Sequence, residues 1–225
     1  MSDLARYADG EGEPRRLLCF GDSNTWGYEP GTGRRFGEGI RWTGRLAAEL
    51  APGWRLVDEG LCSRTTVFED PMSPGRRGLE ALPLALESHQ PLDLVVLMLG
   101  TNDYKRRFSA GDYEIAMGLE RLARLVLASS AGRGGRAPAL LLVAPPPLGP
   151  LGAAEEAFAG GRESSLRLPG RLEALAANLG AAYLDAGSVV ASSPVDGIHL
   201  DPPAHAALAE AFAARIRGLA ASARP

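Results

Sequence analysis

The chain has 225 residues, of which 45% are hydrophobic and 23% are charged, and its formal net charge is −3 at pH 7. These values are typical of a soluble globular protein with a sizeable core, and the slight negative charge argues against a nucleic-acid-binding protein, which would carry a basic face. The longest apolar run, Leu94–Leu99, is too short to cross a bilayer, and residues 1–16 lack the apolar stretch of a signal peptide. We therefore expect a cytoplasmic protein without a membrane or nucleic-acid partner.

Short apolar runs, bounded by Gly, Pro or Asp, alternate with helix-like stretches along the chain. Such runs predict strands buried on both faces, and strands separated by helices predict right-handed crossovers and a parallel sheet covered on both sides. No repeat or linker divides the chain, so we expect a flexible segment over residues 1–16 and one domain over residues 17–221. The expected strands are Leu17–Phe20, Arg55–Val57, Leu94–Leu99, Ala139–Val143 and Ala182–Leu184, and the expected helices are Trp42–Leu50, Leu79–Ser88, Tyr113–Ser129, Ser165–Leu179 and Pro203–Ala221.

Two predicted connections, Tyr28–Arg41 and Ala144–Gly161, are long for this kind of fold. Long loops in compact domains are usually functional, interfacial or disordered. The second loop carries Leu148, Leu151 and Phe158 among prolines and glycines. A monomer would have little reason to expose these side chains, so they favour a homo-oligomer.

Polar clusters follow four of the predicted strands. In an open parallel sheet, ligands bind beyond the carboxyl ends of the strands, so residues just after each strand are the candidates for a site. We expect all four clusters to converge on one edge of the sheet. They are Gly21-Asp22-Ser23-Asn24-Thr25-Trp26-Gly27, Glu59-Gly60-Leu61-Cys62-Ser63-Arg64-Thr65, Gly100-Thr101-Asn102-Asp103 and Asp196-Gly197-Ile198-His199.

Ser23, His199 and Asp196 carry the side chains that acyl transfer needs. A serine hydroxyl is a weak nucleophile that needs a base, imidazole titrates near neutral pH, and a carboxylate must hold the imidazole in the right tautomer. Asp196 precedes His199 by three residues, so one turn can bring the carboxylate to Nδ1 and leave Nε2 facing Ser23. Alone, Ser23 would be interpreted as a helix N-cap, but the other clusters favour a catalytic triad.

The negative oxygen of a tetrahedral intermediate also needs hydrogen-bond donors. The candidates are the backbone N–H of Ser23, the side-chain amide of Asn102 and a backbone N–H in the loop after the second strand. Losing one such donor costs about 10²–10³ in rate, so Asn102→Ala is expected to impair catalysis and to leave the fold intact.

Other residues at this edge are candidates for lining a substrate pocket: Asp22, Trp26, Cys62 and Ile198. Asp22 is also expected to cap a helix, Cys62 to be a small apolar lining residue rather than a nucleophile, and Trp26 to serve as core or pocket wall. His205 is the weaker candidate for the catalytic base.

The motifs resemble the sequence blocks of the SGNH, or GDSL-type, hydrolases, from Gly21-Asp22-Ser23 through Gly100-Thr101-Asn102-Asp103 to Asp196-Gly197-Ile198-His199. Further stretches, among them Arg41-Trp42-Thr43-Gly44 and Arg64-Thr65-Thr66, are similar to the mycobacterial-type arylesterase/acyltransferase (perhydrolase) branch. The resemblance implies a three-layer α/β/α, flavodoxin-like fold, a Ser-His-Asp triad and small esters as substrates. It also implies acyl transfer to water, alcohols or peroxide and a tight homo-oligomer such as an octamer.

The second block of this family usually supplies a glycine N–H to the oxyanion hole. Here the resemblance places Ser63, not Gly60, at that position. Any backbone N–H can donate, so the choice between Ser63 and Gly60 stays open.

Other functions are compatible with the same residues. A sugar-ester deacetylase and a thioesterase or lysophospholipase would use the same triad, because substrate choice is set by the loops. A non-catalytic binding module is disfavoured because all four chemical groups are present, and a redox flavoprotein would be yellow. Neither cysteine has metal-ligand spacing and Gly21–Gly27 lacks a phosphate-binding pattern, so we expect no metal and no cofactor.

Overall fold

Five apolar runs form the strands of one sheet in the computed structural model, which describes residues 13–222. The strands lie in the order β2-β1-β3-β4-β5, and every pairing is parallel. The inner strands β1, β3 and β4 are mostly buried because both of their faces are covered. The parallel sheet of about five strands is therefore confirmed. The strands are β1 (Arg15–Gly21), β2 (Trp54–Gly60), β3 (Leu94–Met98), β4 (Ala139–Ala144) and β5 (Ala182–Asp185).

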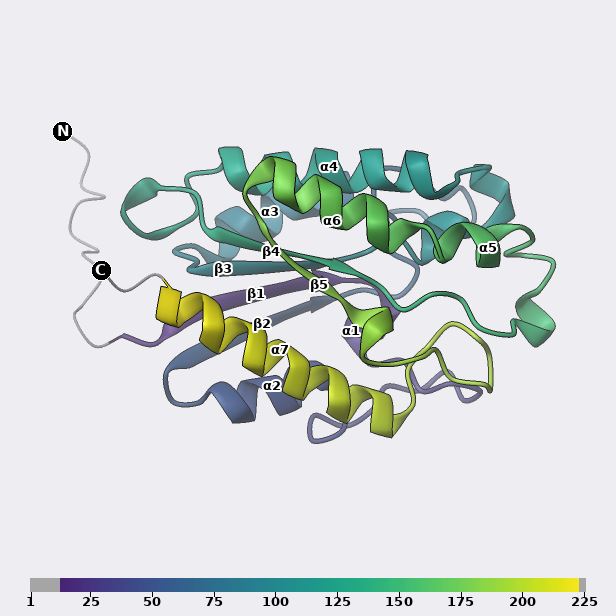
Figure 1. The fold of residues 1–225 in the computed structure, drawn as a ribbon, viewed down its shortest axis with the longest axis horizontal. Helices are drawn as coiled ribbons and strands as arrows, with labels where there is room; N and C mark the ends of the chain where they lie inside the picture. The colour runs from purple at the N-terminus through teal and green to yellow at the C-terminus, as the bar shows by residue number, and fades with distance from the viewer. Residues whose placement is uncertain (1–12, 223–225) are drawn as a thin grey trace.

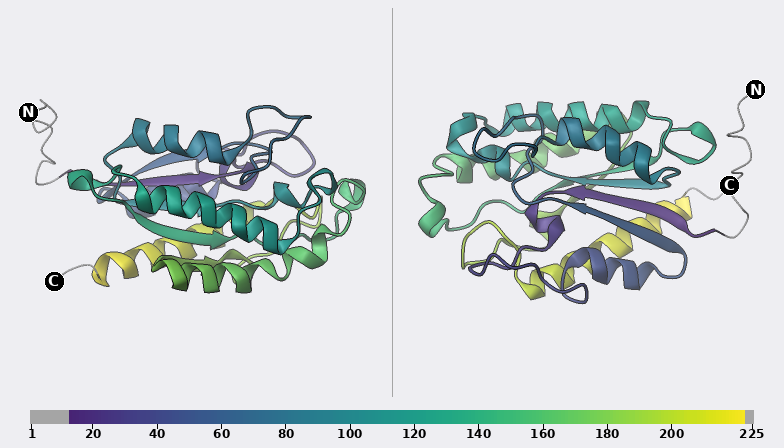
Figure 2. Two further views of the ribbon diagram at one scale, coloured as in Figure 1. Left: turned by 90° about the horizontal axis from the view of Figure 1, so that it is seen from above. Right: turned by 180° about the vertical axis from the view of Figure 1, so that it is seen from behind.

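The helices form one layer on each side of the sheet (Figures 1 and 2). They are α1 (Ser23–Trp26), α2 (Trp42–Leu50), α3 (Gly78–His89), α4 (Asp112–Ala128), α5 (Gly161–Ser165), α6 (Leu168–Leu179) and α7 (Pro202–Ser222). Alternate residues of a strand point to opposite faces. Accordingly, Leu18 and Phe20 pack in a core with α3, α4 and α6, whereas Leu17 and Cys19 pack in a core with α2 and α7. The predicted three-layer α/β/α, flavodoxin-like arrangement is confirmed.

The first strand extends into the segment that the sequence predicts to be flexible, residues 1–16. β1 begins at Arg15, which pairs with Trp54 at the start of β2, because the edge strand continues that far. Residues 1–12 lie outside the described residues. Arg15 and Arg16 therefore belong to the sheet rather than to a flexible segment.

The helix predicted over Ser165–Leu179 is α6, which begins only at Leu168, and Ser165 instead ends the separate short helix α5. Proline fits the first turn of a helix, where its missing N–H is not needed, but not the interior. Pro169 stands in the first turn of α6, so that helix begins at Leu168 and a break separates it from α5. The short helix α1 was not predicted, because four residues are too few to show a periodic pattern.

The long loop between β4 and α5 packs its apolar side chains inside the chain. Leu148, Leu151 and Phe158 are each at most 5% exposed and belong to the core that includes α4 and α6. The expectation that they are exposed is therefore wrong: the loop folds back over the end of the sheet and buries them. The predicted homo-oligomer now rests on the family resemblance alone.

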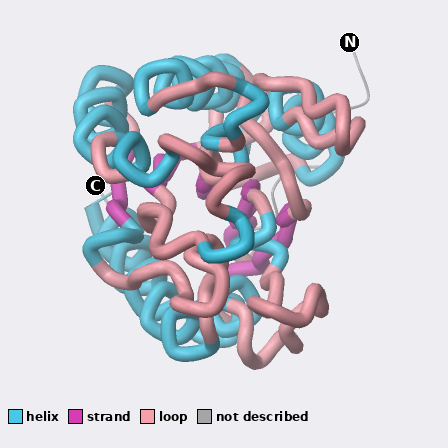
Figure 3. Tube along the Cα trace, turned by 90° about the vertical axis from the view of Figure 1, so that its right-hand side faces the viewer, coloured by secondary structure: helices cyan, strands magenta, loops and turns pink. Residues whose placement is uncertain are grey.

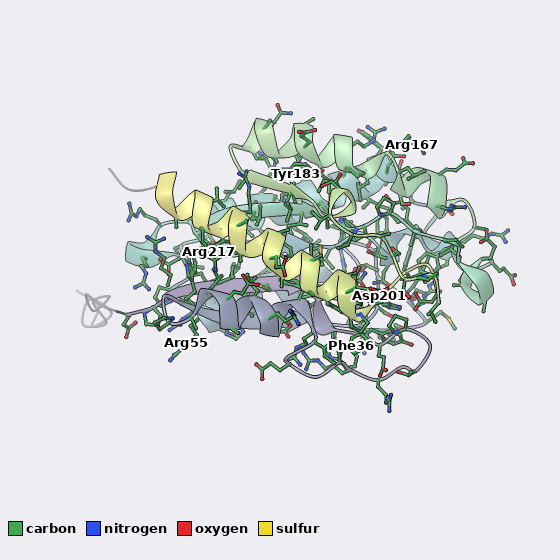
Figure 4. The ribbon with its side chains drawn as sticks, turned by 60° about the horizontal axis from the view of Figure 1, so that its bottom comes forward. Phe36, Arg55, Arg167, Tyr183, Asp201 and Arg217 are labelled. Carbon is green, nitrogen blue, oxygen red and sulfur yellow. The ribbon has the colours of Figure 1, made fainter. Side chains whose placement is uncertain are left out.

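Loops cover the carboxyl ends of the strands, at the end of the molecule that faces the viewer in Figure 3. Phe36 and Asp201 lie toward this end in Figure 4, and Arg55 and Arg217 lie toward the opposite one. The order of the strands reverses direction between β1 and β3, which is where open α/β sheets bind ligands. Within residues 13–222, no helix has the length and apolar character needed to span a membrane.

Candidate active site

The nucleophile candidate Ser23 begins α1, just beyond the end of β1. The turn between them is tight, since a Cβ on Gly21 would lie 2.0 Å from Thr25 Oγ1 and only glycine fits. Asp22 caps α1, with Oδ1 accepting the N–H of Asn24 at 3.0 Å. Ser23 is thus fixed at the carboxyl end of β1, and its own N–H, the first of the helix, has no intrahelical acceptor.

A continuous chain of hydrogen bonds joins Ser23, His199 and Asp196. His199 Nε2 lies 3.0 Å from Ser23 Oγ, and His199 Nδ1 lies 2.7 Å from Asp196 Oδ2. Asp196 Oδ1 accepts the backbone N–H groups of Ile198 and His199 at 2.9 and 3.0 Å. Gly197 makes this turn possible, because its φ is +70° and a Cβ there would lie 2.3 Å from a backbone oxygen of the neighbouring loop. The structure therefore brings together the three predicted triad residues in the order that proton transfer from serine requires.

The two histidines at this end of the molecule have different environments. Burial pushes the pKa of Asp196 upward, but its hydrogen bonds from His199 and Ile198 outweigh that effect and hold the pKa below its usual value. His199 therefore has an ionised partner at neutral pH. His205 is buried, its Nδ1 accepts the N–H of Trp42 at 3.2 Å, and burial lowers its pKa to about 4. His205 is a neutral residue that anchors the start of α2.

Backbone hydrogen bonds distinguish the two candidates for the second oxyanion donor. The N–H of Gly60 is already donated to Asp58 Oδ1 at 3.2 Å. A Cβ on Gly60 would lie 2.2 Å from Trp26 N, so this glycine serves the close packing of α1 on β2. The N–H of Ser63 has no acceptor within residues 13–222, and Ser63 adopts a φ of 64° in the loop. The geometry favours Ser63 as the donor.

The side-chain amide of Asn102 lies beside this loop. Its Nδ2 donates to the carbonyl of Arg64, the residue after Ser63, at 3.1 Å. An amide carries two hydrogens, so one remains for an oxyanion. Arg64 ties the loop to the nucleophile's strand, because its Nη1 donates to Gly21 O at 2.9 Å. The three predicted oxyanion donors are therefore held on adjoining, mutually bonded segments.

The predicted pocket-lining residues differ in their access to solvent. Asp22 is only 1% exposed, and its carboxylate caps α1, so it lies beneath the site. Trp26 and Ile198 are half-buried, and the guanidinium of Arg35 lies 5.1 Å from the centre of the Trp26 ring. Cys62 is also half-buried. Burial and the charge of Asp22 raise the pKa of its thiol, which makes it a poor nucleophile.

A buried carboxyl group beneath the site holds the loop that follows β2. Asp103 is fully buried, and its Oδ1 accepts hydrogen bonds from the backbone N–H (2.9 Å) and the hydroxyl of Thr66. Burial raises the pKa of Asp103 to about 6, and the nearby charge of Asp22 adds to that rise. Asp103 therefore supports the structure of this loop.

We expect Asp103→Asn to change how stability depends on pH. The folded protein keeps a proton on Asp103 up to about pH 6, whereas the unfolded chain releases it near pH 3.9. Wild-type stability thus carries a cost, on the order of 3 kcal/mol, that grows as the pH rises through this window. Urea unfolding should show the variant gaining stability relative to wild type between about pH 4 and about pH 7.

Asp70→Asn provides a control of opposite sign. Asp70 is buried, which raises its pKa, but the hydrogen bond from Arg107 at 2.6 Å outweighs this and lowers the pKa overall. Its stabilising contribution is present at neutral pH and is lost as the pH falls through its folded-state pKa. Stability curves for Asp103→Asn and wild type that run parallel across the window would contradict the assignment.

One residue of the site, Tyr28, has no counterpart among the sequence predictions. Its ring is stacked on the imidazole of His199, with ring centroids 4.0 Å apart and planes inclined by 24°. In the sequence, Tyr28 is distinguished only by its position, five residues after Ser23 and at the start of the long connection Tyr28–Arg41. No local pattern shows that this loop returns over the base.

Comparisons with known proteins agree with this geometry. The profile of the GDSL-like lipase/acylhydrolase family matches residues 19–207. The chain is 41% identical to Est24, a carbohydrate acetylesterase from Sinorhizobium meliloti, with a TM-score of 0.87 over 91% of this chain and 99% of that one. It is also 41% identical to the aryl esterase of M. smegmatis, with the same TM-score and the same coverage. A search of curated proteins finds no match.

Proposed function

The chain belongs to the GDSL-like lipase/acylhydrolase family and is a carboxylic ester hydrolase, and from this premise we propose that Ser23, His199 and Asp196 catalyse its reaction through an acyl-enzyme. One observation carries the proposal: His199 lies within hydrogen-bond reach of both Ser23 Oγ and Asp196 Oδ2. A hydroxyl, an imidazole and a carboxylate in that order are the arrangement that activates a serine for acyl transfer.

In the proposed reaction, His199 Nε2 takes the proton of Ser23 as Oγ attacks the ester carbon. The carbonyl oxygen becomes negative and accepts hydrogen bonds from the N–H groups of Ser23 and Ser63 and from Asn102 Nδ2. Asp196 stabilises the imidazolium that forms. His199 then gives its proton to the leaving alcohol, which breaks the ester bond and leaves the acyl group on Ser23. Water, activated by His199 in the same way, releases the acid.

We further propose small carboxylic esters as substrates, with alcohols or peroxide able to replace water as the acyl acceptor. Similarity to an aryl esterase supports small aromatic esters. Equal similarity to a carbohydrate acetylesterase supports sugar acetates as the second candidate. Initial rates on p-nitrophenyl esters of increasing acyl length and on acetylated sugars distinguish the two substrate classes. The same rates measured with added alcohol show whether an alcohol can replace water. Activity on long chains only would point instead to a thioesterase or lysophospholipase. The cytoplasmic location and the homo-oligomer stay predictions.

Covalent labelling tests the nucleophile directly. An organophosphate is expected to inactivate the enzyme and to add one phosphoryl group to the peptide that contains Ser23, as read by mass spectrometry. p-Nitrophenyl acetate should give a burst of one nitrophenolate per active site if deacylation is slow. Cys62→Ala should be labelled like wild type, since the thiol takes no part. A label on any other residue, with Ser23 unmodified, would refute the proposed function.

A further inference from the structure

The ring of Tyr28 covers one face of the proposed catalytic base. The rings of Tyr28 and His199 are 4.0 Å apart and nearly parallel, closer than the 6.5 Å between Tyr28 and its aromatic neighbour Trp26. Ser23 and Asp196 contact the two nitrogens of the imidazole, at the edge of the ring. The stacked tyrosine contacts a face of the ring and therefore restrains the tilt of the ring plane. An aromatic face also favours a cation, and His199 becomes one during each acyl transfer.

The tyrosine is itself held by the segment that carries the nucleophile. Its backbone N–H donates to Ser23 O at 3.0 Å. The chain turns after Gly27, whose φ of +88° few other residues adopt. Tyr28 then pairs with Arg35 in an isolated antiparallel bridge, which closes the loop into a hairpin. The position of the ring therefore follows from the position of Ser23.

Arg35 fixes this hairpin to the body of the protein. Its Nε donates to Trp26 O at 2.7 Å, and its Nη2 donates to Asp58 Oδ2 at 3.0 Å. Asp58 lies on the edge strand β2 and also accepts hydrogen bonds from Arg41 Nε and Thr43 Oγ1. A chain of contacts thus runs from β2 through the hairpin to the ring on His199.

We infer that Tyr28 is a positioning residue for His199. Its ring holds the imidazole plane in the orientation that faces Ser23 and stabilises the protonated imidazole during turnover. The inference rests on the proposed function, because it requires His199 to be the base. It concerns the face of the ring rather than the tyrosine hydroxyl. It also predicts an effect that is common to all ester substrates, since every acyl transfer uses the same base.

Two substitutions separate the ring from the hydroxyl. Tyr28→Phe keeps the stack and should retain kcat within about twofold of wild type. Tyr28→Leu keeps an apolar cover but removes the aromatic face, and kcat should fall about five- to thirtyfold with KM within about twofold, in line with the size of a cation–π contact. The loss should be the same for acetate, butyrate and hexanoate esters. Arg35→Gln, which loosens the hairpin without changing the ring, should show a smaller loss of the same kind.

The pH dependence of kcat/KM distinguishes this role from a merely structural one, which would leave that dependence unchanged. Without the aromatic face the protonated imidazole is less stable, so the acid limb of kcat/KM should shift to lower pH in Tyr28→Leu but not in Tyr28→Phe. The other ionisable groups facing His199 are Asp196, the buried Asp22 and His205, and all remain in both variants. Any shift is therefore assignable to the lost ring.

Several outcomes would overturn the inference. An unchanged acid limb of kcat/KM in Tyr28→Leu would show that Tyr28 only lines the substrate pocket. A loss of kcat that depends on acyl length would show the same. An equal loss in Tyr28→Phe would assign the effect to the hydroxyl. If Tyr28→Leu fails to fold, Arg35→Gln carries the test through its kcat, and a kcat equal to that of wild type for all three esters would overturn the inference. Organophosphate labelling of Ser23 in the same preparations shows separately whether the proposed function holds.

Discussion

Replacing Ser23 by alanine is expected to lower kcat for p-nitrophenyl acetate by about 10⁶-fold, and His199→Ala by about the same factor. Each substitution removes one end of the 3.0 Å contact between Oγ and Nε2, and neither group can perform its step without the other. The double variant should therefore be no less active than either single variant. The rate above the buffer background at saturating substrate gives the comparison.

The fold should survive both substitutions. Asp22 still caps α1 when Ser23 is replaced. When His199 is replaced, the backbone N–H groups of Ile198 and residue 199 still donate to Asp196 Oδ1, because these bonds do not involve the imidazole. Urea midpoints near that of wild type would establish this. A double variant that loses far more than either single variant would show that the two groups act independently, against the triad.

Asp196→Asn is expected to lower kcat by about 10⁴-fold while the chain stays folded. The amide Nδ2 would donate toward His199 Nδ1, at a contact now 2.7 Å long, and would force the ring proton onto Nε2. A ring that presents N–H to Ser23 cannot accept the serine proton. The asparagine Oδ1 can still accept the two backbone N–H groups, so the turn is kept.

Asp196→Ala gives the matched comparison, since it removes both the catalytic and the structural oxygen. It should be as inactive as Asp196→Asn but less stable by about 1–3 kcal/mol, because two part-buried N–H groups lose their acceptor. Asp196→Asn with activity within tenfold of wild type would show that the carboxylate does not orient the base.

The sequence predicted the sheet well because its strands are contiguous apolar runs with clear boundaries, as in Leu94–Leu99. The same regularity predicted where the polar clusters meet: they come after parallel strands, the last of them beyond a further loop, so they lie at one edge of the sheet. Asp196 and His199 could be paired from their spacing because a single turn decides their contact.

Features that depend on distant contacts were not predicted. Tyr28 reaches His199 from a hairpin that Arg35 bonds to Asp58 on another element. The choice between Gly60 and Ser63 depends on which backbone N–H already has an acceptor, which no sequence pattern records.

The prediction that the apolar side chains of the long loop are exposed is wrong for a similar reason. Leu148, Leu151 and Phe158 occur among prolines and glycines without helical or strand periodicity, so nothing in their spacing indicates which way they point. Only the path of the loop over the end of the sheet shows that they are buried.

The hydroxyl of Ser23 and the ring of His199 stand 176 positions apart in the chain. During synthesis, the serine is thus made long before its proposed proton acceptor exists, and it remains an unreactive alcohol until the segment that carries His199 has docked. Ester turnover by the proposed triad would consequently report only molecules in which that segment has folded onto the sheet, and a shorter nascent chain would contribute nothing to the rate.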